Sequence, residues 1–121
     1  MRSQSIFEIG IQTFLLLIGA GITYFFWKNS LLLTFIYLST ILALFLVNYR
    51  QGDFFAFFFG VVLGFAIEVF ATDITHIHTF AYSDFFGMPM WMPIVWGYCF
   101  LLMKRIGIIL YEEAKEGQAK R

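Results

Sequence analysis

The chain has 121 residues, of which 60% are hydrophobic, 13% are charged and 17 are phenylalanine, and its formal net charge is zero. A soluble domain carries roughly a quarter charged residues, and a small domain leaves much of its surface exposed, so this composition predicts an integral membrane protein. A chain without a basic excess has no electrostatic basis for binding nucleic acid. The single cysteine, Cys99, excludes an intrachain disulfide and a cysteine-based zinc site.

Apolar runs in chain order predict four transmembrane helices, at about 6–27, 31–47, 54–72 and 89–110. Each run approaches the roughly 20 residues that a helix needs to cross the hydrocarbon, and none alternates as a barrel strand does. The first run contains Glu8 near its start and lacks a small-residue cleavage site, so we interpret it as a retained helix and not a signal peptide. The predicted fold is an all-α bundle forming one domain, with a polar cytoplasmic tail at 112–121 that we expect to fray.

Basic residues are concentrated on one side of the predicted bundle, and the positive-inside rule places that side in the cytoplasm. We therefore predict that both termini are cytoplasmic (N-in/C-in), in the inner membrane of a bacterial or archaeal cell. The loop that holds His76 and His78 then faces outward. Only Lys28 lies on the outer side, whereas the basic residues of the inner side are Arg2, Arg50, Lys104, Arg105, Lys115, Lys120 and Arg121.

Lys104 and Arg105 interrupt the fourth span, since the apolar run continues after them. Two interpretations fit this pattern. The charged side chains can snorkel to the inner interface while the helix runs on, or they can face a polar interior. We favour snorkelling.

Glu68 is a charged residue near the end of the third span, and a carboxylate within a membrane-length segment usually has a function or a partner. Ala56, Gly60 and Gly64 precede it at intervals of four and form a slanting stripe of small residues on which another helix can pack closely. The stripe indicates either tight helix packing, with Glu68 bonded to a neighbour, or a polar pocket in which Glu68 is a proton carrier or a general acid or base.

His76 and His78 form a second candidate cluster in the polar stretch after the third span, together with Asp73 and Asp84. In an extended loop the two histidines would point the same way, whereas in a helix Asp73 and His76 would share a face. The interpretations are a polar cap that bonds the loop backbone, a proton relay with Glu68, or a contribution to a zinc or iron site. Because the spacing matches no strong metal signature, we predict no metal site, and the sequence leaves the cofactor unknown.

The fourth span opens with Gly87-Met-Pro89-Met-Trp91-Met-Pro93, and Trp96 follows. Methionine and tryptophan together form a soft, polarizable wall that suits a flat apolar ligand, although Trp91 and Trp96 are five apart and do not share one face. The structural alternative is that these aromatic residues anchor the helix at the membrane–water interface. We predict substrate-binding roles for Tyr82, Trp91 and Trp96, and catalytic roles for Glu68, His76 and His78.

The segment from 68 to 97 resembles small polytopic membrane proteins of carotenoid and other isoprenoid metabolism, of the carotenoid-hydratase-like and lycopene-cyclase-like families. The Pro-x-Glu-Glu motif of lycopene-cyclase-like proteins is absent from the sequence. The resemblance implies a lipophilic substrate reached from the membrane, with Glu68 as the acid or base. It rests on Glu68, His78, Tyr82, Gly87, Pro89, Trp91, Pro93, Trp96 and Gly97.

Three classes of function are compatible with the sequence. The first, which we favour, is a small membrane protein that binds or acts on a lipophilic, isoprenoid-like molecule near the outer membrane face. The second is an accessory subunit of a larger membrane complex, and the third is an oligomeric transporter or channel protomer. The expected partners are membrane lipid and either further copies of this chain or a larger complex.

Overall fold

The computed structural model describes residues 2–120; Arg121, counted above on the basic side, lies outside them. Within these residues there are four helices long and apolar enough to cross a membrane, which confirms the predicted all-α membrane-type bundle. A short π-helix, Val69–Ile74, continues the third of them into the same span. The helices are α1 (Ser3–Phe26), α2 (Ser30–Asn48), α3 (Asp53–Glu68) and α4 (Trp91–Ala119).

Local sequence accounts for several of the helix ends. The Asn29 side chain accepts a hydrogen bond from Leu32 N at 3.2 Å and so caps α2. Gly52, directly before α3, has a φ of 87°, which glycine adopts without strain. Pro93 lies in the first turn of α4, where a backbone N–H would have no helical partner. The missing N–H of proline therefore breaks no helical hydrogen bond at this position.

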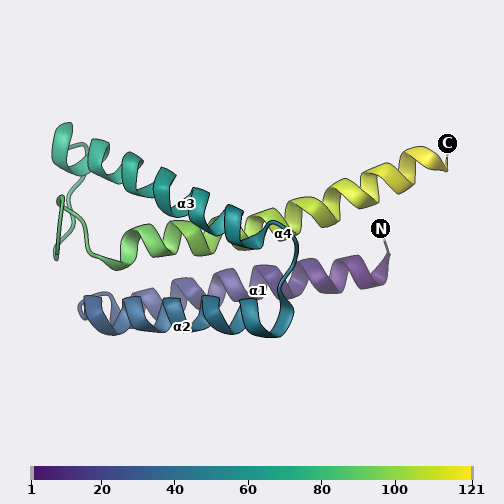
Figure 1. The fold of residues 1–121 in the computed structure, drawn as a ribbon, viewed down its shortest axis with the longest axis horizontal. Coiled ribbons are helices and arrows are strands. Elements are labelled where there is room, and N and C mark those ends of the chain that lie inside the picture. The colour runs from purple at the N-terminus through teal and green to yellow at the C-terminus, as the bar shows by residue number, and fades with distance from the viewer. Residues whose placement is uncertain (1, 121) are drawn as a thin grey trace.

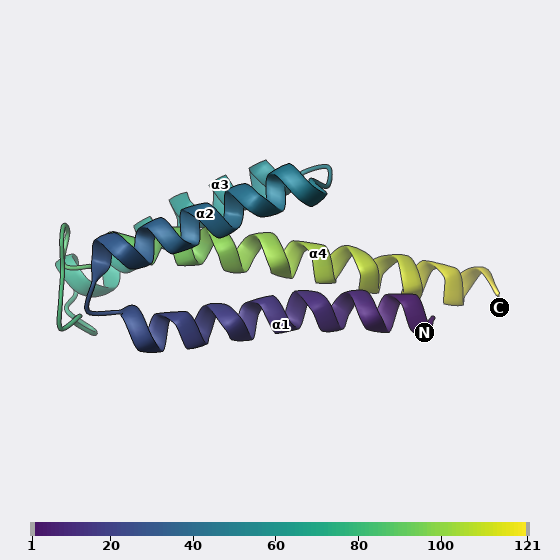
Figure 2. The same cartoon turned by 90° about the horizontal axis from the view of Figure 1, so that it is seen from below.

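Helix α4 is the central element of the bundle. It packs against α1, α2 and α3, and the contact with α3 is the most extensive. Figures 1 and 2 show α1 and α2 as an antiparallel pair, and in both views α4 runs between α1 and α3. Both termini lie at the same end of the bundle as the α2–α3 turn, and the long loop before α4 lies at the opposite end.

Glycines let α3 and α4 approach closely. A Cβ added at Gly60 would lie 2.7 Å from the Phe100 Cβ, and one added at Gly64 would overlap Trp96. On the facing helix, a Cβ at Gly97 would lie 2.7 Å from the Phe57 ring. Small residues on both surfaces therefore permit a contact that larger side chains would prevent.

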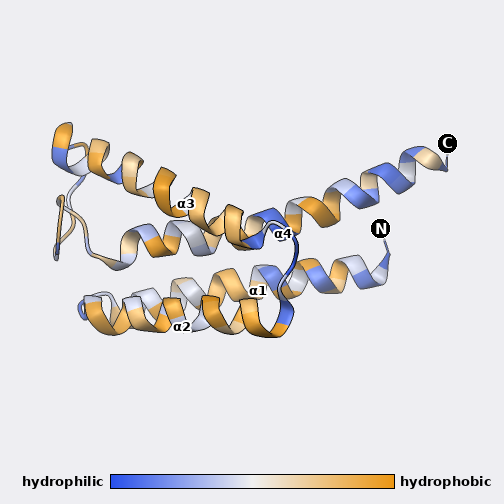
Figure 3. Ribbon diagram, viewed as in Figure 1, coloured by the Kyte–Doolittle hydropathy of each residue, from blue (hydrophilic) through white to orange (hydrophobic). Residues whose placement is uncertain are grey.

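The tail expected to fray continues α4 as a helix up to Ala119. The 29 residues of α4 correspond to roughly 43 Å, more than the roughly 30 Å of the hydrocarbon, so its last turns extend beyond the apolar layer. Figure 3 shows these turns and the start of α1 as largely hydrophilic. Arg2 binds Glu113 at 2.9 Å and Ser5 also donates to Glu113, which holds the two projecting helix ends together.

Candidate functional site

Glu68 is buried at the end of α3, with 5% of the residue exposed. Its Oε1 accepts a hydrogen bond from Trp96 Nε1 at 3.1 Å, and its Oε2 lies 2.9 Å from His78 Nε2. The carboxylate thus joins three parts of the chain, α3, α4 and the loop between them. The His78 side chain is 45% exposed, so it connects the buried carboxylate with the loop surface. An exposed imidazole on a buried carboxylate is an arrangement through which a proton can pass.

The loop beyond α3 folds back over Glu68 because its backbone is tied to the π-helix. The Thr72 hydroxyl donates to Glu68 O at 2.6 Å and contacts Phe86 O at 3.1 Å. Gly87, with a φ of 75°, lies against Thr72. Asp84 accepts from Met90 N at 2.9 Å, which fixes the approach to α4. The backbone N–H groups of Ile77 and His78 donate to Ala71 O at 2.7 and 3.3 Å, which places His78 next to Glu68.

The structure brings together Glu68, His78 and Trp96, and it places the other predicted site residues elsewhere. His76 is exposed and has a φ of 54°, so the histidine pair lies neither in a strand nor in a helix. Tyr82 packs against Trp27, with ring centroids 5.4 Å apart. Trp91 lies on another face of α4 than Trp96, as five helical positions, roughly 140°, require.

Trp91 lines a cavity of about 410 Å³ between α1, α2 and α4. Its indole N–H is buried and has no hydrogen-bond partner among the described residues. The cavity wall is largely apolar and aromatic, with Phe80 from the loop on one side. His78, which contacts Glu68, packs edge-on against Phe80 with ring centroids 5.4 Å apart, whereas Glu68 itself does not line the cavity. The remaining lining residues are Leu16, Gly19, Ala20, Thr23, Tyr37, Met92, Val95, Tyr98 and Cys99.

Two tyrosines, neither of which was among the predicted site residues, shape this cavity. Tyr37 donates to Gly19 O at 2.7 Å, and Tyr98 donates to Leu15 O at 2.6 Å. Both hydroxyls thus fasten α1 to its neighbours, and the tyrosine rings meet edge-on with centroids 5.2 Å apart. Tyrosines well inside apolar spans, away from the interfaces they usually occupy, were the signal that could have found them.

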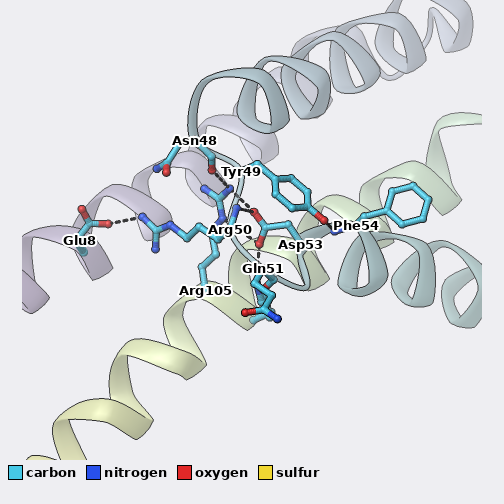
Figure 4. Close-up of polar contacts among 9 residues, drawn as sticks. Glu8, Asn48, Tyr49, Arg50, Gln51, Asp53, Phe54 and Arg105 are labelled. Atoms are coloured by element: carbon cyan, nitrogen blue, oxygen red, sulfur yellow. Dashed lines mark hydrogen bonds and ion pairs between the residues drawn. The ribbon is translucent and has the colours of Figure 1, made fainter.

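A second polar cluster lies at the opposite end of α3, where Asp53 is fully buried. Asp53 Oδ2 accepts from Arg105 at 2.6 Å and from Arg50 N at 2.9 Å, and its Oδ1 accepts from Lys104 at 2.7 Å. Arg105 also donates to Asn48 O at 2.7 Å. Figure 4 shows these groups converging on the α2–α3 turn, where Arg50 pairs with Glu8 of α1.

The favoured snorkelling interpretation is therefore wrong for Arg105, whose side chain is only 1% exposed. The alternative, a polar interior, is what the bundle provides, because Asp53 and the Asn48 carbonyl lie at the same depth. The signal in the sequence was an acidic residue at the start of one span and a basic pair within the next, which are complementary if the helices are antiparallel neighbours.

Within residues 2–120, no group of three or more histidine, cysteine, aspartate or glutamate side chains lies close enough to hold a metal ion. Taken together, the fold and the clusters define a small polytopic membrane protein with four apolar helices. No family model matches the chain, and neither a curated protein nor a solved structure is a match for it.

Proposed function

We propose that this membrane protein binds a lipophilic molecule in the cavity between α1, α2 and α4. The observation that carries the proposal is Trp91, which lines the cavity and whose buried indole N–H lacks an acceptor among the described residues. A buried donor without an acceptor costs about 1–3 kcal/mol, and a ligand oxygen would remove that cost. The volume of about 410 Å³ falls within the roughly 300–1,000 Å³ of ligand pockets.

The ligand class that we propose is an isoprenoid-like compound with an oxygen at one end. The aromatic walls suit a flat, unsaturated body, and the indole N–H of Trp91, which has no acceptor among the described residues, suits one carbonyl or hydroxyl oxygen. The resemblance of residues 68–97 to proteins of carotenoid metabolism points to the same class. Binding has more support than catalysis, because Glu68 does not line the cavity.

The test is mass spectrometry of the detergent-purified protein, first native and then denatured, with the released compound identified. We expect a stoichiometric lipophilic compound on the unmodified chain. Trp91→Phe should bind it up to roughly tenfold more weakly, because one hydrogen bond is lost. Ala20→Phe should fill the cavity and abolish binding, whereas Ala43→Phe, on an exposed position of α2, should retain it.

A chain that carries only bulk lipid would contradict the proposal. Equal loss of the bound compound in Ala20→Phe and Ala43→Phe would contradict it as well. A bound compound without isoprene units would preserve the binding proposal and refute the isoprenoid part.

A second candidate is an accessory subunit of a larger membrane complex or a homo-oligomer. One observation favours it: both carboxylate oxygens of Glu68 are hydrogen-bonded within the chain, as expected of a residue that only stabilises the fold. A second polypeptide or a fixed oligomer that co-purifies from native membranes, and that persists in Glu68→Gln, would support this candidate. Glu68→Gln that abolishes ligand binding would oppose it.

A further inference from the structure

A basic pocket lies beside the α2–α3 turn, at the end of the bundle that carries both termini. It has a volume of about 330 Å³, and no carboxylate lines it. Figure 4 shows three of its side chains around the turn. The lining residues are Arg50, Gln51, Lys104, Arg105 and Ile108.

The cations of this pocket outnumber the carboxylates that bind them. Lys104 and Arg105 share Asp53, and Arg50 pairs with Glu8 at 2.7 Å. Three positive charges and two negative charges leave one positive charge. The exposed Glu112 lines the adjoining pocket, not this one. A ligand with one negative charge would complete the balance.

An apolar groove of about 700 Å³ between α3 and α4 begins where the basic pocket ends, because Lys104 lines both. Phe55, Phe59 and Met103 are more than half exposed, so the groove opens laterally toward lipid. A hydrocarbon-lined groove with a cation at one end is complementary to an anionic amphiphile. The groove is lined by Phe55, Ala56, Phe59, Trp96, Phe100 and Met103, besides Lys104.

We propose that this two-part site binds an anionic phospholipid, with the phosphate in the basic pocket and an acyl chain along the groove. Basic pockets between membrane helices recognise acidic headgroups, and a lipid supplies the hydrocarbon that free phosphate lacks. A zwitterionic lipid would leave the extra positive charge without a counterion. The site is separate from the cavity at Trp91, which lies among α1, α2 and α4, so the two proposals can fail independently.

The experiment is native mass spectrometry of the full chain in detergent, titrated with phosphatidylglycerol or phosphatidylcholine of the same acyl chains. We expect tighter binding of phosphatidylglycerol. Gln51→Glu adds a negative charge to the pocket without removing an ion pair, so it should weaken phosphatidylglycerol binding roughly fivefold or more. Gln118→Glu makes the same change on an exposed turn of the tail and should leave binding unchanged.

The groove is tested by Ala56→Phe, which narrows it, against Ala66→Phe on an exposed position of α3. Only Ala56→Phe should lose the lipid. Thermal stability is measured on every variant. If Ala56→Phe does not fold, the comparison of Gln51→Glu with its control Gln118→Glu decides the outcome. Equal binding of the two lipids, or unchanged binding in Gln51→Glu, would overturn the proposal. Inorganic phosphate that displaces the lipid, together with unchanged binding in a folded Ala56→Phe, would assign the pocket to free phosphate and also overturn it.

Discussion

Asp53 lies at the end of the bundle that carries both termini. It is fully buried, and it accepts hydrogen bonds from two cations of α4 and from the backbone of the α2–α3 turn. Its position in the first turn of α3 adds a favourable interaction with the helix dipole. One carboxylate thereby fixes the turn, the start of α3 and the middle of α4 relative to one another.

Replacing Asp53 by alanine should therefore be strongly destabilising. Arg105 is 2% exposed and would remain as a buried charge without a carboxylate, for which the expected cost is about 3–5 kcal/mol. The measurement is the free energy of unfolding in mixed detergent and dodecyl sulfate. Asp73→Ala, at an exposed position, is the matched control and should stay within about 0.5 kcal/mol. Equal stabilities of the two variants would show that the Asp53 cluster does not hold the bundle together.

Helix α3 is fastened to α4 at both of its ends and in its middle. Asp53 binds Arg105 at one end, Glu68 binds Trp96 at the other, and the glycines lie between them. In lipid the hydrophobic effect does not drive helices together, so close packing and hydrogen bonds between helices must do so. The α3–α4 pair uses both, which explains why it is the most extensive contact in the bundle.

Gly64→Ala should destabilise this pair. The added methyl group would overlap Trp96 and force the indole away from Glu68, at an expected cost of about 1–3 kcal/mol in the same unfolding measurement. Gly10→Ala is the control, because a Cβ there meets no atom within 4 Å and the substitution should be neutral or stabilising by up to about 1 kcal/mol. A Gly64 variant as stable as the Gly10 variant would refute the close packing of the two helices.

The whole molecule is asymmetric along its long axis. Helices α1 and α4 project beyond the α2–α3 turn at the end that carries both termini, as Figure 1 shows, and the charged residues gather there. At the opposite end the loop between the π-helix and α4 covers Glu68. We propose that the charged end is cytoplasmic, since it holds nearly all the basic residues.

Labelling of single cysteines in a Cys99→Ser background tests this orientation. Ser83→Cys, in the exposed loop, should react with a membrane-impermeant maleimide in intact cells. Gln118→Cys, in the last turn of α4, should react only after the membrane is permeabilised. The reverse pattern would place both termini outside and would contradict the positive-inside argument.

The sequence by itself determined the class of protein, the number of spans and the need of Glu68 for a polar partner. These properties are local along the chain: a run of apolar residues is long enough to cross lipid or it is not, and a carboxylate in such a run needs a partner. The stripe of small residues before Glu68 likewise predicted a close helix contact, although not which helix makes it.

Only the tertiary structure decided the partners. Hydropathy fixes the depth of a residue but not the direction in which it faces, because the rotation of each helix depends on packing against the others. For this reason Arg105 is a buried ion pair instead of a snorkelling side chain, and Trp96 binds Glu68 while Trp91 lines a separate cavity. His78 contacts Glu68 and His76 does not, again because of tertiary structure. The conformation of the folded loop, and not the spacing of the histidines, brings His78 to the carboxylate.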